Sequence, residues 1–116
     1  ERDSTQDLRC GGLLVTRVDD YLRKNFMRKL NVSEIAQRFN VSRRLVELRF
    51  REIRGGSVLE RLTALRIAEA KHKLETTTIP VGEIGEICGY RSFRAFCYAF
   101  ASATGTTPRN YRNSSP

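Results

Sequence analysis

The sequence predicts an all-α protein of about seven helices, arranged as two helix-turn-helix subdomains joined by a long linker helix. Three observations predict this fold: apolar residues recur at helical spacing, serines precede two of the apolar segments as caps, and glycines end them. The two capping serines, Ser42 and Ser92, are 50 residues apart, and so are Phe50 and Phe100. This offset predicts that one helix-turn-helix unit is duplicated within the chain.

In chain order, the first expected element is an amphipathic helix from Leu13 to about Asn25. A short helix follows, in which Ala36 is small enough to let the next helix cross it closely. Asn40 and Val41 then form a tight turn before the Ser42 cap.

We divide the chain into a tail or linker remnant (1–12), a first helix-turn-helix subdomain (13–56), a linker helix (57–78), a second helix-turn-helix subdomain (79–112) and a tail (113–116).

The second helix of each unit is expected to bury one face and to present the other. In the first unit this helix runs from Arg43 to about Ile53, and we expect it to bury Leu45, Val46, Phe50 and Ile53. In the second unit the inner face is expected to hold Phe96, Ala99, Phe100 and Ala103. The remaining face of each helix is then free to meet a partner.

A spacer helix over residues 57–76 is expected between the two units, capped by Ser57 and ended by three threonines. Its length is about 30 Å at 1.5 Å per residue. Successive major-groove faces of B-DNA lie about 34 Å apart, so two helices held by such a spacer match adjacent grooves.

The charge of the chain favours a polyanionic partner. Twenty-one Lys and Arg against 13 Asp and Glu give a net charge of +8 and an isoelectric point near 10.0. Residues 21–56 contain ten basic and three acidic residues, whereas residues 79–112 carry a net charge of only +2. A non-specific architectural DNA binder would also be basic, but it would not explain the repeat.

The residues needed for a metal site or for catalysis are scarce. Three widely spaced cysteines, Cys10, Cys88 and Cys97, fit neither a disulfide framework nor a zinc set, and His72 is the only histidine. We therefore expect no enzyme activity, cofactor or metal. No apolar run approaches membrane-spanning length, so a cytoplasmic protein without membrane contact is expected. The chain starts at Glu1 rather than Met, which suggests a fragment.

One long motif carries a family resemblance. It is Gly89-Tyr90-x-Ser92-x-x-x-Phe96-x-x-x-Phe100, followed by Gly105-x-Thr107-Pro108-x-x-Tyr111-Arg112. This pattern resembles the signature of the AraC/XylS family of bacterial transcription regulators, and the resemblance covers about residues 13–112. It extends to Arg66 on the spacer helix, which either braces the two units or reaches a phosphate.

Within the family, SRRLVELRF, GGSVLERL and EICGYRSF are most similar to the xylose-operon regulators. The resemblance implies the carboxy-terminal DNA-binding domain of a sugar-responsive activator, with a sugar effector bound by a domain before Glu1 and with RNA polymerase as a partner. A monomer is expected for the fragment and a dimer is an alternative for a longer protein. Two further alternatives are a free-standing two-motif stress-response regulator and the DNA-binding module of a DNA-repair alkyl-transfer protein.

By the family pattern, base contacts in the first unit come from Arg44, Glu47 and Leu48. An arginine suits guanine, a glutamate suits cytosine N4 and a leucine suits a thymine methyl, although Leu48 is as compatible with burial. The expected DNA-binding set comprises Arg43, Arg44, Glu47, Leu48 and Arg51 in the first unit and Arg91, Phe93, Arg94, Cys97 and Tyr98 in the second. Phe93 and Tyr98 are open to a core role as well.

Overall fold

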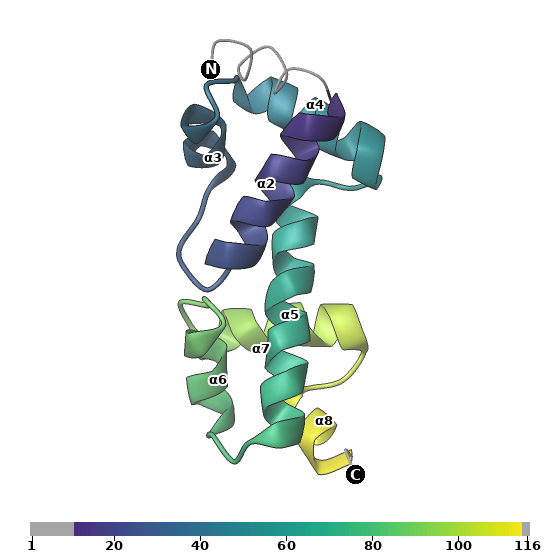
Figure 1. Ribbon diagram of the computed structural model, residues 1–116. Helices are drawn as coiled ribbons and strands as arrows, with labels where there is room; N and C mark the ends of the chain where they lie inside the picture. Colours follow the sequence, from purple (N-terminus) through teal and green to yellow (C-terminus); the bar gives the residue numbers. More distant parts are fainter. Residues whose placement is uncertain (1–10, 115–116) are drawn as a thin grey trace. The chain divides into compact units, whose positions relative to one another are not determined.

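The computed structural model describes residues 11–114, which form seven helices and no strand (Figure 1). In chain order these helices are α2 (Gly11–Asn25), α3 (Val32–Arg38), α4 (Arg43–Arg54), α5 (Val58–Thr76), α6 (Val81–Ile87), α7 (Phe93–Thr104) and α8 (Pro108–Ser114). The predicted all-α class is confirmed. Of the described helices, none is both long and apolar enough to cross a membrane.

The chain divides into two compact units, which we describe separately. The first contains α2, α3, α4 and the start of α5, with Lys29–Leu62 as its main segment. The second contains α6, α7, α8 and the rest of α5, and it also includes the three residues Phe26–Arg28 that follow α2. The division therefore falls inside α5, between Leu62 and Thr63.

In the first unit, α4 packs against both α2 and α3. Its turn has the expected form: Asn40 has a φ of 59°, and the Val41 N–H donates to the Ala36 carbonyl at 3.1 Å. Ser42 then caps α4, its Oγ accepting from the Leu45 N–H at 3.0 Å. The buried apolar residues of this unit are Leu14, Val15, Val18, Leu22, Ile35, Ala36, Val46, Phe50, Val58 and Leu62.

The second unit repeats this construction around three aromatic side chains. Phe96 and Phe100 are fully buried, and their ring centroids lie 5.9 Å apart. Phe100 in turn meets Tyr111 of α8 edge to face at 5.4 Å. The core consists of Ile67, Ala70, Leu74, Ile84, Cys88, Phe96 and Phe100.

Two side chains expected in the cores are exposed. Ile53 of α4 is 49% exposed, and Ala103 of α7 is also exposed, so these two predictions are wrong. The reason is the same in both units. The buried stripe of each helix ends at its phenylalanine, Phe50 or Phe100, and the following turn leaves the core.

The turn of the second unit is one residue longer than that of the first. Gly89, with a φ of 102°, takes the place of Asn40, and the Tyr90 N–H bonds to the Gly85 carbonyl as Val41 bonds to Ala36. One residue separates Asn40 from Ser42, whereas two separate Gly89 from Ser92. The additional residue is Arg91, since the Ser92 cap of α7 is retained.

Arg66 of α5 is held within the second unit. Its Nε donates to the Phe26 carbonyl and its Nη2 to the Arg28 carbonyl, each at 2.8 Å. The guanidinium also lies 5.5 Å from the centre of the Tyr90 ring. These contacts commit the guanidinium to backbone carbonyls and an aromatic ring, which argues against a phosphate as its partner.

A buried carboxylate organises the first unit. Asp19 of α2 is 4% exposed and receives Arg61 of α5 at 2.6 Å and Arg54 of α4 at 3.4 Å. Arg23 adds a longer contact of 3.7 Å from within α2. Burial alone raises the pKa of Asp19, but the hydrogen bond and charge of Arg61, followed by Arg54 and Arg23, outweigh it and leave the pKa below 3.8.

The contact between α6 and α7 gives a first test. A Cβ at Gly85 would lie 2.7 Å from Cδ2 of the buried Phe96, so we expect Gly85→Ala to destabilise the protein by about 1–3 kcal/mol, as overpacking does. Gly82 on the same helix has its nearest neighbour at 3.8 Å. Gly82→Ala is the control and is expected to be neutral or stabilising by up to about 1 kcal/mol. Urea unfolding measures the change in stability of both variants. Equal changes would contradict the close crossing of α6 and α7.

The Asp19 cluster gives a second test. We expect Asp19→Asn to lower the free energy of unfolding near pH 7 by about 2–3 kcal/mol, because three arginines lose their counter-charge. Since the folded pKa lies below 3.8, this stabilisation is present above that pH and is lost as the pH falls through the folded pKa. Asp20→Asn is the control, because its ion pair with Arg23 is exposed. The difference between the two variants, measured by thermal unfolding from pH 7 to pH 2, should vanish at the acid end.

Candidate nucleic-acid interface

The exposed side of α4 is positively charged and unneutralised. Arg43, Arg44 and Arg51 are exposed, and none of their side chains has an ion-pair or hydrogen-bond partner within residues 11–114. Arg43 and Arg44 lie in the first turn of the helix, where the free backbone N–H groups add positive potential. This end of α4 is therefore suited to an anion such as a phosphate or to the acceptor edge of a base.

The two other predicted contact residues of α4, Leu48 and Glu47, differ in exposure and in hydrogen bonding. Leu48 is 47% exposed, so burial no longer explains it. Glu47 is half-buried, and its Oε1 accepts a hydrogen bond from the Val58 N–H at 3.4 Å. Val58 is the first residue of α5, where a carboxylate interacts favourably with the helix dipole. Glu47 thus has a structural contact that its sequence position did not reveal.

The exposed side of α7 is mainly apolar. Phe93 is 54% exposed and Tyr98 is 77% exposed, so neither belongs to the core. Arg94 is exposed and has no partner among the described residues, and Arg91 is exposed in the turn before the helix. Cys97 is half-buried; burial raises the pKa of its thiol above 9.0 despite the opposing charge of Arg109, so the group is neutral near pH 7.

The two helices share only one exposed contact residue. With the offset of 50, Arg44 corresponds to Arg94, whereas Glu47 corresponds to Cys97 and Leu48 to Tyr98. Arg43 corresponds to Phe93 by the same offset. Both helices have 12 residues, a serine cap and a glycine end in the left-handed region. An equivalent frame therefore presents two chemically different surfaces.

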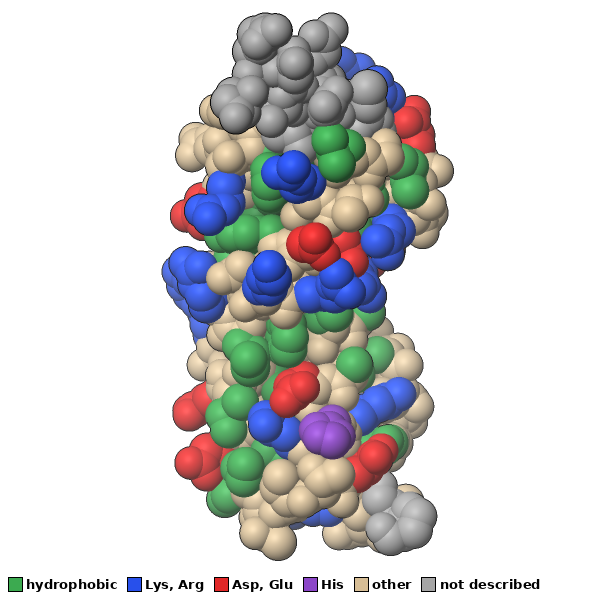
Figure 2. Space-filling model, viewed as in Figure 1, with side chains coloured by type: hydrophobic (Ala, Val, Ile, Leu, Met, Phe, Trp, Pro, Cys, Tyr) green, Lys and Arg blue, Asp and Glu red, His purple; other side chains and the backbone are tan. Residues whose placement is uncertain are grey.

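Basic side chains also gather on the surface of the first unit. On the face in view in Figure 2, Lys and Arg side chains gather over the part of the molecule formed by α2 and the start of α5. This gathering agrees with the excess of basic residues in the first half of the chain.

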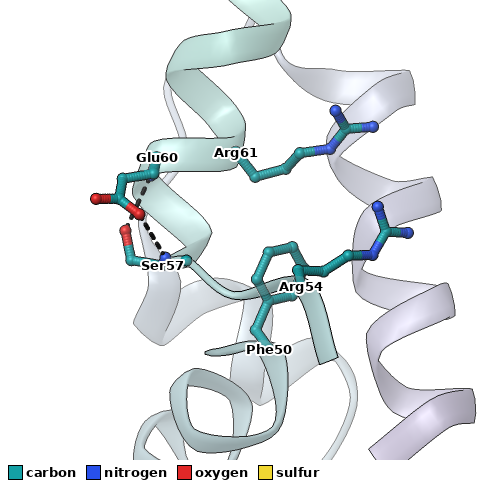
Figure 3. Close-up of a pocket in the computed structure, with 6 residues that line it drawn as sticks. Phe50, Arg54, Ser57, Glu60 and Arg61 are labelled. Carbon is teal, nitrogen blue, oxygen red and sulfur yellow. Dashed lines mark hydrogen bonds between the residues drawn. The ribbon is translucent and has the colours of Figure 1, made fainter. Parts of the chain in front are cut away.

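A pocket of about 290 Å³ lies where α4 meets the start of α5 (Figure 3). Ser57 and Glu60 form a reciprocal capping box on one side: the Ser57 N–H donates to Glu60 at 2.9 Å, and the Glu60 N–H donates to Ser57 at 3.0 Å. Arg54 and Arg61 extend together on the other side, where both reach Asp19. Because each polar side chain lining the pocket has a partner, no free group is left there to recognise a ligand.

The cysteines and acids of residues 11–114 do not assemble into a metal site: no three His, Cys, Asp or Glu side chains are grouped there. Burial raises the pKa of the Cys88 thiol to about 11, and this side chain is part of the second core. Cys10 lies outside the described residues.

Two serine-capped helices, each crossing a shorter helix and each presenting basic or aromatic side chains, define a tandem helix-turn-helix DNA-binding protein. A family model described as a helix-turn-helix domain matches residues 35–114. The xylose operon regulatory protein of Escherichia coli K12 is 30% identical over 113 residues, which is 97% of this chain and 29% of that protein. The chain belongs to the AraC family of helix-turn-helix transcription regulators.

Solved structures agree with this assignment. The C-terminal domain of AraT, a response regulator from Geobacillus stearothermophilus, superposes with a TM-score of 0.84 at 32% identity, covering 86% of this chain and 84% of that one. The DNA-binding domain of AdpA, solved in complex with a target DNA, gives a TM-score of 0.82 at 30% identity, covering 86% and 90%.

Sequence reasoning missed Asp19, which fixes α4 through Arg54 and α5 through Arg61. A signal was present, because Asp19 lies four residues after Val15 and three before Leu22, and both are buried. An acid on the apolar stripe of a helix predicts a buried partner. Its partners come from distant parts of the chain, so the stripe alone does not name them.

Glu47 accepts a hydrogen bond at the start of α5 and is also a predicted base contact, and two variants can distinguish these roles. Glu47→Gln keeps an oxygen that can accept from the Val58 N–H, so we expect it to retain most of the stability, whereas Glu47→Ala should lose about 1 kcal/mol. If Glu47 also reads cytosine, the glutamine variant should change the base preference without unfolding the protein. Chemical unfolding and competition binding of both variants provide the measurement; equal stability of the two would remove the capping role.

Proposed function

We propose that this chain reads a specific duplex DNA sequence for a transcription regulator, with α4 and α7 as its two major-groove helices. The observation that carries the proposal is the pair of partnerless arginines at equivalent positions, Arg44 and Arg94, at the start of two equivalent helices. Arginine at such a position is suited to bidentate pairing with guanine. One such arginine on a single helix would be equally compatible with an ordinary solvated surface, so the repetition on two equivalent helices is what favours DNA recognition.

The first unit is proposed to supply most of the electrostatic affinity. Arg43 is suited to a phosphate, Arg44 to a base edge and Arg51 to the backbone farther along the groove. Glu47 and Leu48 are proposed to contribute to base choice beside Arg44. In the second unit, Arg91 is suited to a phosphate, and Phe93, Arg94, Cys97 and Tyr98 are proposed to face the bases.

Finer assignments rest on the relatives. We propose an activator that contacts RNA polymerase and responds to a sugar through a further domain. The further domain is supported by the matching xylose operon regulatory protein, which has more than three times the matched length. We also propose that this chain acts in the cytoplasm, binds DNA as a monomer when isolated, and carries out no catalysis.

Selection of bound sequences from a random duplex pool, performed with this chain, tests the central proposal. Enrichment of one sequence with two conserved blocks is the expected result. Binding to every duplex with equal affinity would instead indicate a non-specific architectural protein, and its salt dependence alone would not distinguish the two.

Arg44→Ala and Arg43→Ala form a matched pair for the first unit. Arg44→Ala is expected to weaken binding of the selected sequence by about 1–3 kcal/mol and to relax the preference at one base pair. Arg43→Ala is expected to weaken selected and random duplexes alike and to reduce the salt slope by about 1. Titrations at several salt concentrations measure both effects. Equal weakening on both duplexes by Arg44→Ala would rule out its role in base recognition.

A further inference from the structure

The exposed face of α7 has a composition that does not suit hydrogen-bonded base recognition. Apart from Arg94, its outward side chains at the DNA-facing positions are Phe93, Cys97 and Tyr98. None of these three side chains can pair bidentately with a base edge, because Phe93 has no polar group, the Cys97 thiol is only a weak donor and Tyr98 carries a single hydroxyl. A helix with these residues gains affinity mainly by burying apolar surface.

These aromatic side chains are not surplus core residues. The core positions of α7 are filled by Phe96 and Phe100, both fully buried, and Phe93 and Tyr98 stay 54% and 77% exposed. Leaving two large rings in water forgoes the stabilisation that burial would bring, so a partner that covers them gains it.

The frame of α7 indicates what this partner is. Its cap, length and glycine end match those of α4, and Arg94 stands at the position of the partnerless Arg44. Arg94 also gives this otherwise apolar face a positive charge, as a duplex requires. The base edges of a major groove offer one apolar group, the C5 methyl of thymine.

We propose that α7 recognises thymine methyl groups, with Phe93, Cys97 and the ring of Tyr98 forming an apolar surface around the Arg94 guanidinium. This inference rests on the proposed DNA-binding function and specifies the chemistry of its second half. The preference of this half is directed to thymine, and the part of its affinity that comes from methyl contacts depends weakly on salt, because these contacts release no counterions.

Uracil is the sharpest probe, because it differs from thymine only by lacking that methyl group and keeps the pairing edge. The experiment uses the duplex selected from the random pool, and the half read by α7 is the block whose preference changes in Arg94→Ala. Each thymine in that block is replaced singly by uracil, and affinities are measured by titration.

The expected result is a loss of about fourfold in affinity for each contacted thymine, equivalent to one buried methyl group. In Tyr98→Ala or Phe93→Ala, the uracil effect should shrink at one position each, while the salt slope stays unchanged. Both residues are exposed, so these variants should fold, and circular dichroism confirms it.

Arg94→Ala is the matched control on the same helix: it should weaken binding and leave the uracil effect intact. An α7 block without thymine, or one in which uracil binds as well as thymine, would overturn the methyl proposal and leave the DNA-binding function standing. Failure of the pool to yield any preferred sequence would overturn the proposed function itself.

Discussion

The close crossing of the two helices in each motif is the constraint on which the rest of the structure depends. In the second unit α6 can approach α7 only because Gly85 has no side chain where Phe96 lies. Ala36, buried at 2% exposure, occupies the same place in the first unit. The packing of Phe96 against α6 fixes the rotation of α7 about its own axis. This rotation leaves Phe93 and Tyr98 outside the core.

Around this shared frame the two units have become chemically different. Uncompensated arginines dominate the outward surface of α4, whereas aromatic side chains dominate that of α7. The first type of surface attracts any nucleic acid from a distance, and the second acts only on contact. A protein that combines both can associate quickly through charge and discriminate through short-range fit.

The sequence was most informative where a structural feature depends on nearby residues. The Ser42 and Ser92 caps and the Gly55 and Gly105 ends lie within a few residues of the groups they bond, so spacing alone predicted them. The positions of Ile53 and Ala103 were mispredicted, because periodicity does not tell how far a neighbouring element extends along a helix. The contact residues on α4 and α7 were predicted from the family pattern. The structure shows that most of them are exposed and that Glu47 and Cys97 are half-buried.

Long-range partners lay beyond what sequence alone can specify. Asp19 meets Arg61 across 42 positions and Glu47 meets Val58 across 11, and no local signal pairs them.

The contacts of Arg66 have a consequence for how this protein can be divided. Because residues 26–28 pack with the second unit while the residues on both sides of them belong to the first, the chain passes between the units three times, after residues 25, 28 and 62. A segment starting at residue 63 would leave the Arg66 guanidinium without the two carbonyls that it binds. The repeat visible in the sequence is thus no longer a pair of exchangeable modules, and recombination that moved one motif alone would separate Arg66 from its partners.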